Sequence, residues 1–186
     1  MKPSVVIFED SGYSNLFPIA LTRPVFDLRC GILTLKEKIT HDFPHYPVAL
    51  LCRDYLADYV QSQNPDIPVN VMPESDCIFI NGRIIADGSL PELLNVQEEK
   101  ILLRDGQVVA ARLKGDHIDQ FSKSIIENSE LDFLKDVSRT EIESAKLAGY
   151  FWDLVHHNPS EIQQDFKYFN WGGIIEGTVS SHAVLR

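Results

Sequence analysis

Three cationic residues lie close together in the first part of the chain: Arg23, Arg29 and Lys38. The chain as a whole is acidic, with a formal net charge of −10, so this local group of cations contrasts with its surroundings. The planar guanidinium group of arginine can hold two phosphate oxygens at once, and lysine adds a single point charge. These residue types at this spacing indicate a site that can bind a polyphosphate.

The segment that contains these cations begins after a short apolar run. Residues 4–8 read Ser-Val-Val-Ile-Phe, which predicts a buried strand, and the polar residues 9–12 follow it directly. A long irregular segment then leads to the first predicted helix, and such loops in compact domains are usually functional. Because ligands of α/β proteins bind at the carboxyl ends of the strands, we expect Asp10 and Gly12 to lie at the binding site.

A second candidate segment is Asn81-Gly82-Arg83, which follows another apolar run. We expect the loop after the first strand to bring Arg23, Arg29 and Lys38 close to it, because the carboxyl ends of parallel strands meet at one edge of a sheet. The glycine would let the backbone approach a ligand closely. The three residues of this segment are therefore predicted to contact a nucleotide or a sugar.

The sequence leaves a second interpretation of the cations open. They can equally pair on the surface with acidic residues of the same segment, namely Glu9, Asp10, Asp27 and Glu37. In that case Arg23 would only shape the loop. Its removal would then lower the melting temperature without changing nucleotide binding.

The elements that must position these residues alternate between strand and helix up to residue 80. Thr34 is a predicted helix N-cap, with Glu37 as its capping-box partner, and this helix should end before Pro44. The spacing of apolar residues predicts a second helix within residues 53–63. Apolar runs predict strands at residues 4–8, 47–52, 67–72 and 77–80. The alternation predicts an α/β fold with a doubly wound, mostly parallel sheet and the first strand at its centre.

The pattern changes after residue 80. Asp105-Gly106 separates two apolar runs and predicts a hairpin, because both residues tolerate a positive φ. Asn81-Gly82 also lies between apolar runs, and it is either a second hairpin turn or a loop at the carboxyl end of a strand. Weaker helical patterns cover residues 116–135 and 159–169.

Length and composition limit the class of protein. The chain has 186 residues, which suits one domain or one domain and a piece of a second, and its acidic excess excludes an electrostatic nucleic-acid binder. No apolar run reaches the length of a membrane span or of a signal-peptide core. The three cysteines, Cys30, Cys52 and Cys77, form no disulfide or zinc pattern. We expect a cytoplasmic protein that binds neither nucleic acid nor membranes.

The C-terminal residues have a pattern of their own. Gly177-Thr-Val179 is matched six residues later by Ala183-Val-Leu185, and this period is typical of a hexapeptide, left-handed β-helix. Such a coil needs at least about three repeats to be stable. We therefore predict one domain over residues 1–170 and a linker with the start of a β-helix over residues 171–186. We expect the chain to be part of a longer protein, which would form homo-oligomers through its β-helix.

Several motifs resemble those of the sugar-phosphate nucleotidyltransferases. In that superfamily the first strand leads into the pattern Arg-Leu-x-Pro-Leu-Thr-x-x-x-Pro-Lys, and residues 15–25, Asn-Leu-Phe-Pro-Ile-Ala-Leu-Thr-Arg-Pro-Val, follow the same frame. The chain resembles more closely a divergent branch related to the bifunctional N-acetylglucosamine-1-phosphate uridyltransferase/acetyltransferase. The motifs of that branch are present as Ile7-Phe-Glu-Asp10, Thr22-Arg-Pro24, Arg29-Cys-Gly31, Thr34, Glu37-Lys38 and Asn81-Gly82-Arg83.

The resemblance implies a nucleotide-diphospho-sugar transferase-like fold and a specific reaction. A nucleotidyl group would pass from UTP or dTTP to a sugar-1-phosphate, and pyrophosphate would be released. The partners would be a nucleoside triphosphate and a sugar-1-phosphate, with Mg²⁺ as the cofactor. Arg23, Arg29 and Lys38 would be the catalytic cations.

The chain departs from the better-known enzymes of the superfamily at three charged positions. Val25 replaces a lysine, Asn15 replaces a loop arginine, and Arg83 replaces the metal-binding aspartate of a Gly-Asp pair. Two alternatives therefore stay open. The protein is either an active transferase, in which arginines have taken over phosphate neutralisation, or a catalytically degenerate domain that binds a nucleotide or sugar phosphate and is attached to a β-helix acyltransferase.

The departures also affect the expected metal site. The carboxylates that remain as candidate Mg²⁺ ligands are Glu9, Asp10 and Asp87, and none stands at the superfamily's metal position. The ligand set is therefore not assigned by the sequence.

Overall fold

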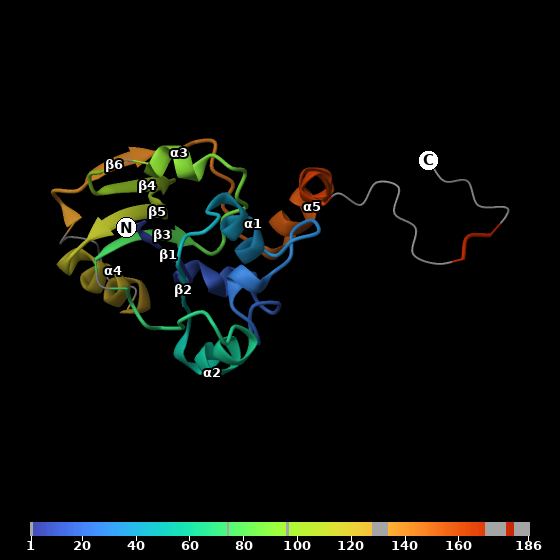
Figure 1. Ribbon diagram of the computed structural model, residues 1–186, viewed down its shortest axis with the longest axis horizontal. Coiled ribbons are helices and arrows are strands. Elements are labelled where there is room, and N and C mark those ends of the chain that lie inside the picture. The colour runs from blue at the N-terminus through green and yellow to red at the C-terminus, as the bar shows by residue number, and fades with distance from the viewer. Residues whose placement is uncertain (1, 74, 96, 128–133, 170–177, 181–186) are drawn as a thin grey trace.

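The structure is a computed structural model that describes residues 2–73, 75–95, 97–127, 134–169 and 178–180. Within these residues, six strands form one sheet in the order β2-β1-β3-β5-β4-β6 (Figure 1). The strands are β1 (Ser4–Phe8), β2 (Val48–Leu51), β3 (Asp76–Asn81), β4 (Lys100–Arg104), β5 (Gln107–Lys114) and β6 (Ser138–Glu141). The α-helices are α1 (Leu35–Asp42), α2 (Asp54–Gln63), α3 (Leu90–Leu94), α4 (Asp116–Glu127) and α5 (Phe151–Asp165).

The sheet is mixed. β1 lies in its interior, parallel to both β2 and β3, and β4 runs parallel to β6. β5 is antiparallel to both of its neighbours, β3 and β4. The prediction of an α/β fold is confirmed, and parallel pairs outnumber antiparallel ones by three to two. β1 lies one strand from the edge of the sheet and not at its centre, because β2 alone pairs on its outer side.

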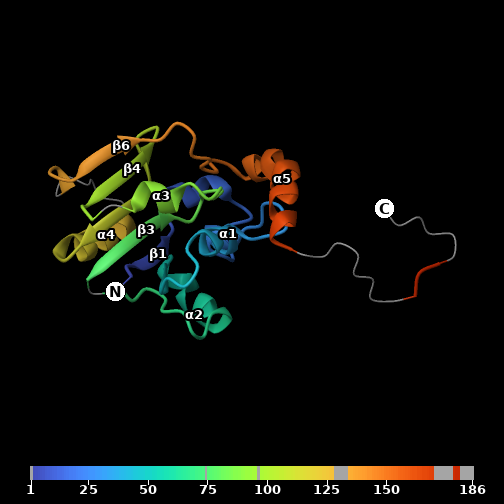
Figure 2. The same ribbon diagram turned by 45° about the horizontal axis from the view of Figure 1, so that its top comes forward.

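Helices cover both faces of the sheet, which explains why β1 is continuously apolar. Val5 and Ile7 point into a core that includes residues of α1, α2 and α3, whereas Val6 and Phe8 point into a core with α4. A strand that is buried on both faces cannot alternate between apolar and polar residues. α5 lies beside α1, on the side of the molecule away from β6 (Figures 1 and 2).

The local signals for the turn and the first helix are confirmed. Asp105 and Gly106 have φ values of 50° and 74° and connect β4 to β5 as a hairpin. Thr34 and Glu37 form the predicted capping box at the start of α1. Asn81-Gly82 is a loop at the carboxyl end of β3, the second of the two alternatives, since the backbone N–H of Gly82 donates to the carbonyl of Phe8 in the neighbouring strand.

The predicted strand at residues 67–72 is reduced to a single bridge. Val69 pairs with Leu50, and the backbone N–H of Asn70 donates to the Leu50 carbonyl at 2.8 Å. Asn70 then adopts a φ of 56°, in the left-handed region, which turns the chain away from β2. This conformation prevents the pairing from continuing.

The two weaker helical predictions have different boundaries from the observed helices. α4 is described from Asp116 to Glu127, and the rest of its predicted range up to residue 133 lies outside the described residues. α5 begins at Phe151, earlier than expected. The apolar pair that suggested the second helix, Ile162 and Phe166, is 42% and 52% exposed. The α5 positions that face the protein include two acids, Glu161 and Asp165, so its buried side could not be recognised from hydrophobicity.

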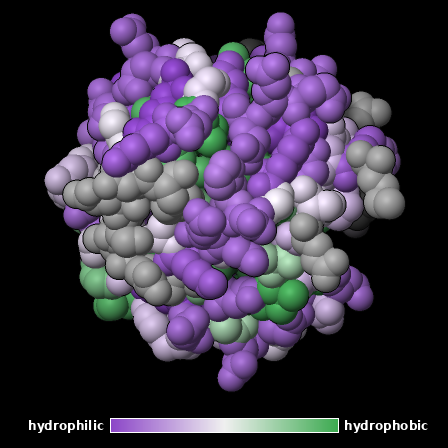
Figure 3. Space-filling model, turned by 90° about the vertical axis from the view of Figure 1, so that its left-hand side faces the viewer, coloured by the Kyte–Doolittle hydropathy of each residue, from purple (hydrophilic) through white to green (hydrophobic). Residues whose placement is uncertain are grey.

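The predicted β-helix repeats lie outside the described residues, apart from 178–180. The aliphatic residues Ile174, Ile175 and Leu185 of this segment belong to the part that is not described. Val179 is described and is 39% exposed. In the described part of the chain, no helix has the length and apolar character needed to cross a membrane. The side of the molecule in Figure 3 is mostly hydrophilic, with small separate apolar patches.

The contact between α4 and the sheet provides a test of the core. Phe121 is fully buried, and its ring lies edge-on to those of Phe8 and Phe79, with centroids 5.7 and 4.7 Å away. We expect Phe121→Ala to lower the free energy of unfolding by about 3–5 kcal/mol, because it leaves a cavity in a packed core. The exposed Phe166 is the control, and Phe166→Ala should change it by less than about 1 kcal/mol. Equal losses in urea unfolding would contradict this description of the core.

Candidate functional site

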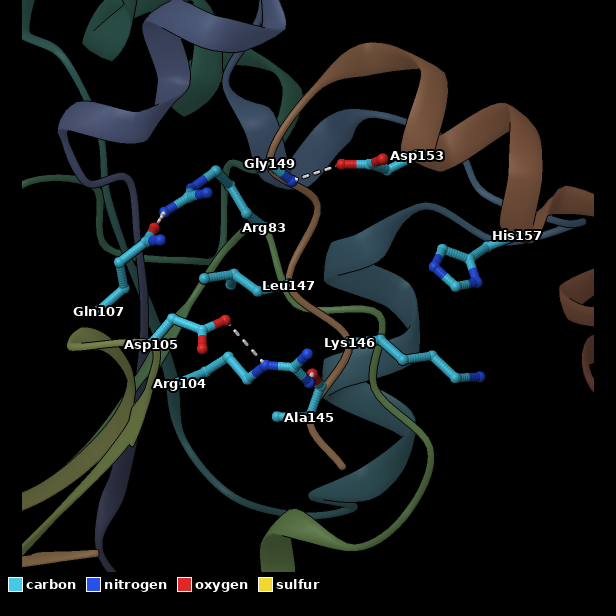
Figure 4. A pocket seen from close by; sticks show the side chains of 10 residues that line it. All are labelled: Arg83, Arg104, Asp105, Gln107, Ala145, Lys146, Leu147, Gly149, Asp153 and His157. Carbon is cyan, nitrogen blue, oxygen red and sulfur yellow. Dashed lines mark hydrogen bonds and ion pairs between the residues drawn. The ribbon is translucent and has the colours of Figure 1, made fainter. Parts of the chain in front are cut away.

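Two hollows lie at the carboxyl ends of β1, β2 and β3. The first has a volume of about 530 Å³ and is lined by residues that follow β1 and β2, among them Glu9, Asp10 and Arg53. The second has a volume of about 310 Å³ and lies between the end of β3, the β4–β5 turn and the start of α5 (Figure 4). Arg83 lines this second hollow.

One ion pair forms the wall between the two hollows. Arg83 donates from Nε to Oδ1 of Asp10 at 2.7 Å and from Nη2 to Oδ2 at 2.6 Å, which is a bidentate pair. Arg83 is 1% exposed, and its remaining hydrogen bonds go to the Ala148 carbonyl at 3.0 Å and to Gln107 Oε1 at 2.8 Å. The guanidinium group is therefore a fixed, buried charge.

The loop after β1 closes over this pair. Asn81 donates from Nδ2 to Asp10 Oδ2 at 2.8 Å, and the backbone N–H of Gly12 donates to Asp10 Oδ1 at 3.2 Å. A Cβ atom at residue 12 would overlap with the guanidinium group of Arg83. The predicted binding residues Asp10, Gly12, Asn81 and Arg83 are thus together, as expected, but they bind one another.

A second ion pair fixes the long loop to the end of β2. Glu9 accepts hydrogen bonds from Nε and Nη2 of Arg53, both at 3.1 Å, and from the backbone N–H of Val25 at 2.8 Å. Nη2 of Arg53 also donates to the carbonyls of Ala20 and Arg23. The guanidinium carbon lies 4.3 Å from the centroid of the Tyr13 ring. Sequence reasoning missed Arg53, although it follows a strand that ends at the same edge.

Lys38 lies away from the predicted binding site. It is 3% exposed, and its Nζ pairs with Glu161 Oε2 at 3.0 Å and with Asp165 Oδ1. Both acids belong to α5, and Glu161 also pairs with Lys146 at 3.1 Å. Lys38 therefore neutralises carboxylates of its own chain and is not brought together with Asn81, Gly82 and Arg83.

The loop before α1 also binds α5. The backbone N–H groups of Ile32 and Leu33 donate to Asp165 Oδ2 at 2.8 and 3.0 Å, and that of Gly31 donates to Asn158 Oδ1 at 2.8 Å. Gly31 has a φ of 86°, and a Cβ atom there would overlap with Asp165. This loop has the form of a backbone anion site. Its anion is a carboxylate of the protein, so the motif expected to bind phosphate positions a helix.

Arg23 and Arg29 are the predicted cations that stay exposed. Together with Lys36 they line a third hollow of about 420 Å³, which Arg83 does not line. Lys36 pairs with Asp27 at 2.9 Å. Burial alone would raise the pKa of Glu37, but hydrogen bonds from Thr34, and then the charges of Arg29 and Lys36, hold it below its usual value. The structure thus brings Arg23 and Arg29 together at a hollow that the other predicted residues do not line, and the Arg23 carbonyl contacts Arg53 of the first hollow.

The first hollow contains a cysteine that is not a nucleophile. Burial, followed by the nearby charge of Glu9, raises the pKa of the Cys52 thiol to about 12. A thiol attacks and binds metals as the thiolate, so Cys52 is inert near neutral pH. Binding in this hollow must come from its hydroxyl, aromatic and charged side chains.

The fold is shared with several solved structures. A protein assigned as a glucose-1-phosphate thymidylyltransferase, from Bacillus anthracis and in complex with sucrose, has a TM-score of 0.57 at 13% identity over 95% of this chain and 98% of its own. An inositol-1-phosphate CTP transferase from T. maritima has a TM-score of 0.60 at 8% identity over 87% and 96% of the two chains. The molybdopterin-guanine dinucleotide biosynthesis protein A of Archaeoglobus fulgidus has a TM-score of 0.56 at 11% identity over 84% and 97%.

These likenesses define the class of fold. The chain shares its fold with a protein assigned as a thymidylyltransferase and with a CTP transferase. A narrower assignment comes from the sequence of the chain. It belongs to the sugar nucleotidyl transferase family, whose model matches residues 5–172. A comparison with curated proteins finds no match.

The role of Lys38 can be tested through stability. Lys38→Met leaves two buried carboxylates without their main cation, and we expect a loss of about 3–5 kcal/mol in the free energy of unfolding, measured with urea. Lys123→Met, at an exposed position of α4, is the control and should change it by less than about 1 kcal/mol. A stable Lys38→Met protein would show that the contact with α5 is dispensable.

Proposed function

We propose that this protein transfers a nucleotidyl group from UTP or dTTP to a sugar-1-phosphate and releases pyrophosphate. The observation that carries the proposal is the pair of hollows that share the Asp10–Arg83 wall. Transfer between two bound substrates needs adjoining sites that hold the attacking oxygen and the α-phosphate in line. Membership of the sugar nucleotidyl transferase family supports the same reaction.

The first hollow is proposed to take the nucleoside. Tyr13, Tyr55 and Ile125 line it, so a flat base can pack against aromatic and aliphatic surfaces. Ser11 and Ser14 line it as well and offer hydroxyl groups for hydrogen bonding.

The second hollow is proposed to take the sugar phosphate. Its lining is mainly polar, with Lys146, His157 and Arg104 as cations or potential cations and Gln107 as an amide. In Figure 4, Arg83 and Gln107 point toward each other at one side of the hollow, and Lys146 and His157 lie at the other. Amide groups and cations are suited to the hydroxyl and phosphate groups of such a ligand.

The proposed chemistry needs no covalent bond to the protein. An oxygen of the sugar phosphate forms a bond to the α-phosphorus, the bond to the bridging oxygen breaks, and pyrophosphate leaves with the electron pair. The protein binds, orients and neutralises the reactants. Arg23 and Arg29 are proposed to meet the charge of the departing pyrophosphate, whereas Lys38 is held by α5 and is left out of this proposal.

A second candidate function is binding of a nucleotide or a sugar phosphate without catalysis. The observation that favours it is that Asp10 and Arg83 are saturated by contacts within the protein. This candidate predicts that ligands bind but that no pyrophosphate is released.

The Mg²⁺ expected from the resemblance does not fit the carboxylates named for it. Glu9 and Asp10 are each engaged by an arginine, and Asp87 Oδ1 accepts two hydrogen bonds from Ser89. In the described ranges, no group of three His, Cys, Asp or Glu residues is arranged to hold a metal ion. No step of the proposed reaction is therefore assigned to a metal.

Other parts of the proposal concern the chain beyond its fold. We propose that the chain is related to the uridyltransferase/acetyltransferase branch and that it is cytoplasmic. We also propose a domain at 1–170, a β-helix start at 171–186, and oligomerisation through a β-helix. The match of the family to residues 5–172 supports the first boundary.

The activity is tested by pyrophosphate release. We expect release above background when UTP or dTTP is combined with a sugar-1-phosphate, and none when either substrate is omitted, because attack on the α-phosphate needs both. The panel should include several sugar-1-phosphates, each assayed with and without Mg²⁺. Binding of a triphosphate without release for any pair would favour the second candidate.

The role of Arg23 is tested by nucleotide titration. Arg23→Ala should weaken UTP binding by about 1.5–3 kcal/mol, the range for a hydrogen bond to a charged group, and Arg23→Lys should recover part of it. Arg139→Ala, on β6, removes the same charge far along the sheet and is the control. Unchanged calorimetric titration, with a lower melting temperature, would mean that Arg23 only shapes the loop.

A further inference from the structure

We infer that Glu9 and Asp10, the two carboxylates at the end of β1, are permanent partners of arginine and not ligands of a divalent metal ion, so that this protein binds its phosphate-bearing ligand without Mg²⁺. The inference rests on the proposed function for the nature of the ligand. The contacts of the two carboxylates carry it.

The hydrogen-bonding capacity of Asp10 is fully used. An ionised carboxylate has about four lone-pair positions. Asp10 fills them with Nε and Nη2 of Arg83, Nδ2 of Asn81 and the backbone N–H of Gly12, at 2.6–3.2 Å. A metal ion could bind an Asp10 oxygen only by displacing one of these donors.

The hydrogen-bonding capacity of Glu9 is also fully used. Oε1 accepts from the backbone N–H of Val25 and from Nη2 of Arg53, at 2.8 and 3.1 Å. Oε2 accepts from Nε and from the backbone N–H of Arg53, both at 3.1 Å. Four donors again occupy one carboxylate.

The arginine at Asp10 is held in place by several contacts. Arg83 is 1% exposed, it is held from the other side by Gln107 and Ala148, and the backbone at Gly12 lies against its guanidinium group. Loss of Asp10 as its partner would leave a buried charge uncompensated, which is strongly unfavourable. Mg²⁺ also requires near-octahedral coordination and keeps several waters, which a carboxylate already saturated with hydrogen bonds does not permit.

Positive charge for the ligand is available from other residues. Arg23 and Arg29 are exposed and line one hollow, and among the described residues neither side chain forms a salt bridge. These two guanidinium groups can thus supply positive charge to a polyphosphate that extends from the first hollow into this one.

The first test uses Mn²⁺ alone with the full chain, followed by the electron paramagnetic resonance signal of the free ion. We expect that the wild-type protein, Asp10→Asn and Glu9→Gln reduce this signal equally, because neither carboxylate is a ligand. Mn²⁺ binding to the wild type that is lost in Asp10→Asn or in Glu9→Gln would overturn the inference.

A gain of metal binding gives a complementary test. Arg83→Asp removes the guanidinium group and places a second carboxylate beside Asp10, so this variant should acquire a Mn²⁺ site that disappears in Arg83→Asp/Asp10→Asn. A folded Arg83→Asp protein without such a site would show that Arg83 does not keep metal from Asp10. If Arg83→Asp does not fold, the inference is judged from the Mn²⁺ titrations of the wild-type protein, Asp10→Asn and Glu9→Gln.

The last test compares calorimetric titrations with UTP in Mg²⁺ and in EDTA. We expect dissociation constants that agree within about fivefold, which is about 1 kcal/mol. A larger loss of affinity in EDTA would overturn the inference. If neither UTP nor dTTP binds in either buffer, the proposed function fails, and the Mn²⁺ measurements still decide on the carboxylates.

Discussion

The ion pair between Asp10 and the buried Arg83 holds together four segments that are far apart in the sequence. Asp10 follows β1 and Arg83 follows β3, while the other acceptors of Arg83 are Gln107, at the start of β5, and the carbonyl of Ala148, ahead of α5. Neither charge could be buried alone without a large penalty. The edge of the sheet, the closed loop and the approach to α5 therefore form as one unit.

Charges are also paired within the protein where α5 meets α1. Lys38 and the backbone N–H groups of Ile32 and Leu33 surround a carboxylate of Asp165 in the way that a phosphate site surrounds its ligand. An acidic chain has many carboxylates available for such positions. A backbone geometry that suits an anionic ligand thus holds an anionic side chain here and fixes a helix to the domain.

Local signals made much of the fold predictable, and contacts between distant segments made most of the site unpredictable. The capping box at Thr34 and the turn at Asp105-Gly106 depend on residues within a few positions of each other, so their prediction was correct. Lys38 looked available because its partners are more than 120 residues away on α5. Glu161 and Asp165 are one helical turn apart, a spacing that would have shown a charged face, but nothing in the sequence indicates that this face is buried.

The absence of a side chain at Gly12 has an evolutionary consequence. Because a Cβ atom there would occupy the space of the Arg83 guanidinium group, the two positions cannot vary independently. A lineage that replaces Gly12 must first shorten residue 83, and a lineage that introduces arginine at 83 must already have glycine at 12. The two positions are therefore coupled in a fixed order: residue 83 can shorten while residue 12 is glycine, whereas residue 12 can gain a side chain only after residue 83 has shortened.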